Sequence, residues 1–107
     1  MIRVVIDEAA RSLTVCGHAE YAEAGQDIVC AAASILVYTL AERLKAMDSL
    51  DHAEFRHGFA SVGATACSNA EAALETVACG FALLAKNYPN NIDVEGGDIS
   101  PLKFDTI

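Results

Sequence analysis

Two pairs of short alternating runs, each pair followed by a long helical run, constrain the fold of this chain most. The first pair, "IRVVID" and "SLTVCGH", places apolar residues at alternate positions and predicts a β-hairpin over about residues 2–18. The second pair lies within "DHAEFRHGFASVGA" and predicts another hairpin that turns around His57 and Gly58. A chain that pairs its strands in this way needs helices to cover the apolar face of the sheet.

The first helix is predicted from Ile28 to about Leu50, where apolar residues recur at helical spacing. Asp27 precedes this run and is a suitable N-cap, because its carboxylate can accept hydrogen bonds from free N–H groups of the first turn. The polar segment 19–27 before it, which contains Gly25, is predicted to be a loop.

The second helix is predicted for "SNAEAALETVACGFALLAKNY", with Ser68 or Asn69 as its cap and Glu71 in its first turn. Pro89 ends it, and "NIDVEG" predicts a last short strand. The order ββαββαβ predicts a two-layer α/β domain in which two helices cover one mixed sheet. We expect a single domain over 1–107, with about 96–107 as a peripheral C-terminal tail.

The charge balance excludes some classes of partner. Seven Lys and Arg against fifteen Asp and Glu give a net charge of −8, and the basic residues form no cluster. Direct nucleic-acid binding is disfavoured, whereas a basic partner would be attracted. No apolar run is long enough to cross a membrane, and "MIRVVIDEAARS" lacks the features of a secretory leader, so we expect a cytoplasmic protein.

Four cysteines, in a reducing compartment, are expected to be free thiols. Cys30 would be the third residue of the first helix, where free N–H groups and the helix dipole stabilise a thiolate and could hold an oxyanion. His18 stands at the end of a predicted strand. The loop 19–27 could bring Cys30 back to that end, where His18 would act as its base. The alternative is that Cys30 is a small buried hydrophobic residue and His18 a surface residue without a role.

The residues around this pair have structural explanations too. Asp27 is first of all an N-cap, and orienting His18 or fixing the loop is a secondary role. Ser34 lies one turn after Cys30 on the same helical face. Gly25 permits a positive φ, which would let the loop act as a lid.

Zinc is a competing chemistry, because Cys16, His18 and Cys30 could supply three ligands. Their spacing is not a strong zinc signature, and the chain has no C-x-x-C pair. Cys67 and Cys79 are interpreted as packing residues. His52 and His57 are assigned to a surface hairpin without a role.

The second predicted helix is apolar on more than one face, with Leu74 and Phe81 on one side and Cys79 and Leu83 beside it. Such a helix is buried on two sides, and in a small domain the second surface could belong to another subunit. The alternative is that alanine is simply common in helices.

The segments "GHA" and "DIVCAAAS", with a glycine-containing loop between them, resemble the ribosomal-processing cysteine protease family, the bacterial Prp or YsxB-like proteins. The similarity extends over about residues 1–95, including the paired strands, the long helix and a second helix that ends in "NYP". It is most specific over 17–34, where histidine, aspartate, cysteine and serine all match.

The resemblance implies that Cys30 is a nucleophile and His18 its base, and that Asp27 supports the site. Gly17, Gly25 and Ser34 match further motif positions. Because of this resemblance, we expect a small homodimeric endopeptidase that uses no cofactor. The resemblance implies that the substrate is the N-terminal extension of a basic large-subunit ribosomal protein, number twenty-seven. It also implies that the loop from Ala19 to Asp27 closes over the peptide as a lid.

Overall fold

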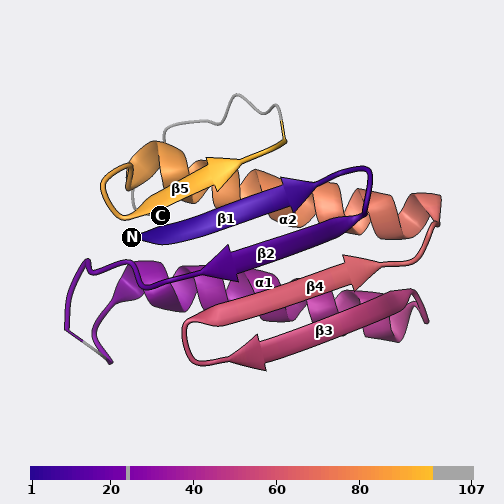
Figure 1. Cartoon of the computed structure of the whole chain (residues 1–107), viewed down its shortest axis with the longest axis horizontal. Helices are drawn as coiled ribbons and strands as arrows, with labels where there is room; N and C mark the ends of the chain where they lie inside the picture. The colour runs from indigo at the N-terminus through magenta and orange to yellow at the C-terminus, as the bar shows by residue number, and fades with distance from the viewer. Residues whose placement is uncertain (24, 98–107) are drawn as a thin grey trace, which may run out of the picture.

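The structure is a computed structural model that describes residues 1–23 and 25–97, and it confirms the predicted two-layer α/β fold. A mixed sheet has the strand order β3-β4-β2-β1-β5, and both helices lie against one face of it (Figure 1). Only the β1–β5 pair is parallel; the other neighbours are antiparallel. The elements are β1 (Ile2–Asp7), β2 (Ser12–Cys16), α1 (Ile28–Ala46), β3 (Leu50–Arg56), β4 (Phe59–Ala64), α2 (Ser68–Asn87) and β5 (Ile92–Glu95).

The core forms between the sheet and the helices because alternate strand residues point toward α1 and α2. In β1, Ile2 and Val4 are buried and their neighbours are exposed. Phe81 of α2 is fully buried in this layer. The two helices approach closely at Gly80, where a Cβ atom would lie 2.6 Å from Cδ2 of Leu36. A larger residue at this position would require the Leu36 side chain to move.

The two helix ends differ from the sequence-based prediction. Helix α1 ends at Ala46 and not near Leu50, because Asp48 takes a left-handed conformation with φ of 56° and stops the helix. Leu50 instead begins β3. At the start of α2 the predicted caps were wrong, because the cap position is held by Cys67 and the helix already begins at Ser68.

The structure describes only the first two residues of the predicted C-terminal tail. The predicted peripheral tail covers 96–107, of which residues 98–107 lie outside the described residues. Within the part of the chain that the structure describes, neither helix is apolar enough over its length to cross a membrane.

Candidate active site

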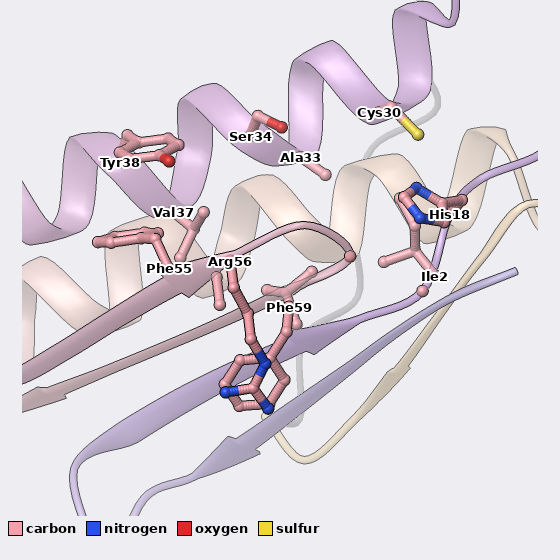
Figure 2. A pocket seen from close by; sticks show the side chains of 14 residues that line it. Ile2, His18, Cys30, Ala33, Ser34, Val37, Tyr38, Phe55, Arg56 and Phe59 are labelled. Atoms are coloured by element: carbon pink, nitrogen blue, oxygen red, sulfur yellow. The ribbon is translucent and has the colours of Figure 1, made fainter. Parts of the chain in front are cut away.

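The chain turns sharply between β2 and His18. Gly17 has a φ of 93°, and its N–H donates to the carbonyl oxygen of Gly58 at 2.8 Å. A Cβ atom at Gly17 would lie 2.4 Å from the carbonyl oxygen of Met1, so only glycine fits. The turn ends the extended run at Cys16. It places His18 just beyond the end of β2, where it faces the start of α1 (Figure 2).

The His18 imidazole is bordered by the turn between β3 and β4. The ring of His57 lies 4.8 Å from it, centroid to centroid, with the planes tilted by 43°. Gly58 faces it so closely that a Cβ atom there would lie 3.1 Å from Nε2 of His18. The sequence analysis gave His57 no role; the structure places it next to the predicted base.

Cys30 is the third residue of α1, as predicted, and its side chain is half-buried. Its sulfur points from the helix start toward the imidazole of His18 (Figure 2). The sulfur accepts a hydrogen bond from the backbone N–H of Ala19, at 3.3 Å. The thiol thus contacts both the helix and the first residue of the loop.

Asp27 caps α1, as predicted, and also binds the loop. Its Oδ1 accepts from the N–H groups of Val29 at 3.0 Å and Cys30 at 2.9 Å, and its Oδ2 from those of Tyr21 at 3.0 Å and Ala22 at 3.4 Å. Partial burial acts to raise the pKa of Asp27, but these four hydrogen bonds, led by that from Cys30, hold the pKa below its ordinary value.

The four hydrogen bonds to Asp27, here called the Asp27 clamp, change the expectation that the helix start holds an oxyanion. Because the N–H groups of Val29 and Cys30 donate to Asp27, they are not available to an oxyanion in this arrangement. The N–H that faces the sulfur comes from Ala19 instead.

Two hollows meet at the predicted dyad, and His18, Cys30 and Ser34 line both of them. The aromatic hollow, about 140 Å³, runs between α1 and the β3–β4 hairpin (Figure 2). The rings of Tyr38 and Phe55 stack in its wall with centroids 4.3 Å apart. The loop hollow, about 420 Å³, lies on the other side of the pair and is lined by Glu20, Ala22, Gly25, Asp27 and Ala31 together with the three shared residues.

The remaining predicted site residues take the positions expected of them. Ser34 is exposed one turn after Cys30. Gly25 has a φ of 85° with open space around it, so the loop uses the left-handed conformation that glycine permits.

The zinc alternative does not fit the geometry. Leu13 and Val15 of β2 face the core, so Cys16 projects from the opposite side of the sheet, away from the helix that carries Cys30. Across residues 1–23 and 25–97, no three His, Cys, Asp or Glu side chains gather into a possible metal site.

The other two cysteines behave differently from one another. Cys67 packs against the core, as predicted. The N–H groups of Ala70 and Asn69, which lie near its sulfur without forming a cap hydrogen bond, hold the pKa of Cys67 below its ordinary value. Cys79 is exposed on α2, so its interpretation as a packing residue was wrong for the monomer.

Comparison with solved structures shows the same fold in known proteins. Two crystal structures of the essential ribosomal processing protease Prp from S. aureus match the chain. The one with a covalently linked product peptide has a TM-score of 0.74 and 21% identity, and covers 88% of this chain and 95% of that chain. The one with a substrate peptide has a TM-score of 0.70 and 19% identity over the same shares. SMU.848 from Streptococcus mutans matches with a TM-score of 0.68 and 24% identity, over 88% and 90% of the two chains.

No curated protein sequence matches the chain. The family model described as cysteine protease Prp does match, over residues 1–93. This range contains every predicted site residue and nearly all of the described fold. The chain therefore belongs to the cysteine protease Prp family and is a cysteine protease.

Proposed function

We propose that the chain is an endopeptidase in which Cys30 is the nucleophile and His18 the base. His18 takes the proton of Cys30, and the thiolate attacks the carbonyl carbon of a peptide bond. His18 then gives the proton to the leaving amine, and water hydrolyses the acyl-enzyme, with His18 again as the base. Asp27 supports the site by holding the loop and the helix start together.

The observation that carries the proposal is that the two hollows meet at His18 and Cys30. An endopeptidase must hold its substrate on both sides of the bond that it cuts. The aromatic hollow offers a largely apolar surface on one side, and the loop hollow offers the acidic side chains of Glu20 and Asp27 on the other. A peptide that crosses the junction would bring one carbonyl group to the Cys30 sulfur.

For the substrate, we propose the N-terminal extension of the large-subunit ribosomal protein number twenty-seven, cut in the cytoplasm during ribosome maturation. The similar S. aureus structures are of a ribosomal processing protease with substrate and product peptides. The net charge of −8 agrees with a basic substrate. The predicted homodimer stays a prediction. Its expected place on α2 has less support than one on α1, where Ile28, Ile35 and Tyr38 are exposed.

The experiment follows the mass of the precursor protein over time with the native chain and with Cys30→Ala and His18→Ala. We expect the native chain to release one short N-terminal peptide and both variants to release none at a measurable rate. Cys16→Ala is the matched control, because it removes an exposed thiol from the opposite face of the sheet and should leave cleavage unchanged.

Other outcomes separate the alternatives. Cleavage that persists in Cys30→Ala contradicts the assigned nucleophile. A precursor that binds tightly but is never cut supports an alternative function, a module that binds a ribosomal protein without enzymatic action. If the precursor neither binds nor reacts, the proposed substrate is wrong.

A further inference from the structure

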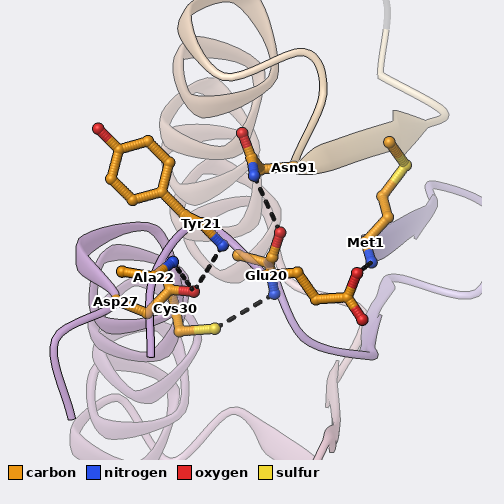
Figure 3. A network of polar contacts seen from close by, with 8 residues as sticks. Met1, Glu20, Tyr21, Ala22, Asp27, Cys30 and Asn91 are labelled. Atoms are coloured by element: carbon orange, nitrogen blue, oxygen red, sulfur yellow. Dashed lines mark hydrogen bonds and ion pairs between the residues drawn. The ribbon is translucent and has the colours of Figure 1, made fainter. Parts of the chain in front are cut away.

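Ala19 is held at three points beside the Cys30 sulfur. Its side chain is buried, with 1% of its surface exposed. Its N–H donates to the sulfur at 3.3 Å, and its carbonyl oxygen accepts a hydrogen bond from Nδ2 of Asn91 at 3.0 Å (Figure 3). These contacts hold the peptide planes on both sides of the Ala19 Cα atom, so loss of the hydrogen bond at the carbonyl group would free the residue to turn and weaken the contact at its N–H.

The chain next to Ala19 does not hold this arrangement by itself. Glu20 has a φ of 55°, a conformation that costs energy for any residue other than glycine. Its carboxylate lies 4.0 Å from the N-terminal amino group of Met1, but the Glu20 side chain is largely exposed. A surface ion pair of this kind contributes little. Asp27 holds Tyr21 and Ala22 on one side of this strained turn. On the other side, the turn needs support at Ala19.

Asn91 gives that support because its own backbone is fixed. Its N–H donates to the carbonyl oxygen of Tyr88 at 3.0 Å, and its carbonyl oxygen accepts from the N–H of Ile2 at 2.9 Å. The residue thus stands where the end of α2 meets the start of β1 and β5. Its side-chain amide reaches from this junction to the loop.

A hydrogen bond to a sulfur limits the orientations of its side chain, and a nucleophile that is held in place reacts faster. We propose that Asn91 is a positioning residue. By holding the carbonyl group of Ala19, it keeps the Ala19 N–H on the Cys30 sulfur and so holds that sulfur in the orientation from which it attacks. This inference rests on the proposed role of Cys30 as nucleophile.

The test measures the rate at which iodoacetamide alkylates each cysteine of the full chain, resolved by peptide mass spectrometry. At a fixed pH, this rate reports how readily each sulfur attacks a small electrophile. In Asn91→Ala and Asn91→Asp we expect Cys30 to react about threefold to tenfold more slowly, the range for loss of one ordinary hydrogen bond. The aspartate variant keeps the size of the side chain but cannot donate to Ala19 when ionised.

Two controls make the result specific. Asn90→Ala changes the neighbouring, exposed asparagine and should leave the Cys30 rate at the native value. Cys67 in the same samples serves as an internal reference, because its thiol lies at the start of α2 and should react equally in all variants. A folded Asn91→Asp protein that alkylates Cys30 at the native rate overturns the proposal.

A second measurement needs no change at Asn91 and tests the contact on which the proposal depends, so the proposal can still be overturned if those variants do not fold. Hydrogen exchange of the Ala19 amide should be slow in the native chain and clearly faster in Cys30→Ala, which lacks the acceptor. Equal exchange in the two proteins overturns the proposal. Neither measurement uses a substrate. Failure to cut the ribosomal precursor would therefore contradict the proposed function without deciding the role of Asn91.

Discussion

The imidazole rings of His18 and His57 lie with their centroids 4.8 Å apart and their planes tilted by 43°. They come from different parts of the chain, His18 from beyond the end of β2 and His57 from the turn between β3 and β4. The rings meet because β2 and β4 are antiparallel neighbours in which Cys16 pairs with Phe59. This contact restricts the orientation of the predicted base relative to Cys30.

Replacing His57 by alanine should therefore slow cleavage without abolishing it. We expect kcat/KM for the ribosomal precursor to fall about tenfold, because a base that is less well oriented transfers protons less often in the productive geometry. His57→Phe keeps an aromatic ring beside His18 and should stay within about twofold of the native value. If the phenylalanine variant is as slow as the alanine variant, a polar property of His57 matters and not its ring.

Gly58 can be tested against a glycine that also has a positive φ but has a different neighbour. Gly58 has a φ of 73°, and an added Cβ would lie 3.1 Å from Nε2 of His18. Gly97 has a φ of 66°, and an added Cβ would make an ordinary contact of 3.4 Å with Ile6. Alanine at either position should lower the free energy of unfolding by about 1–2 kcal/mol, because both conformations are strained for alanine.

Only Gly58→Ala should also displace the His18 imidazole, so we expect kcat/KM to fall about tenfold in that variant alone. Denaturant unfolding and precursor cleavage measure the two effects separately. Equal loss of activity in both variants would mean that reduced stability, and not contact with His18, is the cause.

The local features of the site were predictable because each depends on residues close in the sequence. Asp27 is recognisable as a cap from its place before an apolar periodic run, and this fixes Cys30 as the third residue of α1. Alternation predicts both hairpins, and hence that His18 follows the end of a strand. Gly25 is recognisable as a residue that permits a left-handed loop.

The contacts between distant segments were not predictable in the same way. His57 and Asn91 reach the site only because the strand order is β3-β4-β2-β1-β5, and periodicity within one segment carries no information about that order. The sequence also shows that a cap is needed near Ser68 but does not show that the position is held by Cys67. The hydrogen bonds of Asp27 to the loop depend on how the loop folds back, which its composition does not determine.

The stacked wall of the aromatic hollow predicts a mutation that changes substrate binding more than chemistry. Phe55 stacks on Tyr38 at 4.3 Å, away from the Cys30 sulfur (Figure 2). Phe55→Ala should raise KM about fivefold to tenfold with little change in kcat, because it removes apolar contact area that substrate and transition state share. His52→Ala is the control on the same strand, since that exposed ring lies over Gly63 and outside the hollow. An unchanged KM in Phe55→Ala would show that the substrate does not extend this far.

The clamp formed by Asp27 predicts how stability depends on pH. In the folded chain, partial burial acts to raise the pKa of Asp27, but hydrogen bonds from four backbone N–H groups outweigh it and lower the pKa below that of the unfolded chain. A carboxyl group with a lowered folded pKa contributes stability that is fully present above its unfolded value, about 3.9. This contribution is lost as the pH falls through the lowered folded value, because both states are then protonated.

Asp27→Asn removes this titration but keeps one oxygen that can accept from the helix start. Near neutral pH we expect the variant to be less stable than the native chain by about 1 kcal/mol, because an amide nitrogen in place of Oδ2 cannot accept from the N–H groups of Tyr21 and Ala22. Below about pH 4 the difference should shrink, because the Asp27 carboxyl group takes up a proton in the unfolded chain first and in the folded chain only at lower pH. Denaturant unfolding over a series of pH values measures it. Asp93→Asn is the control: this exposed carboxylate forms only a surface ion pair with Arg3, at 3.9 Å, and should change stability less at neutral pH. A difference for Asp27→Asn that stays constant into strong acid would show that charge on the clamp does not stabilise the fold.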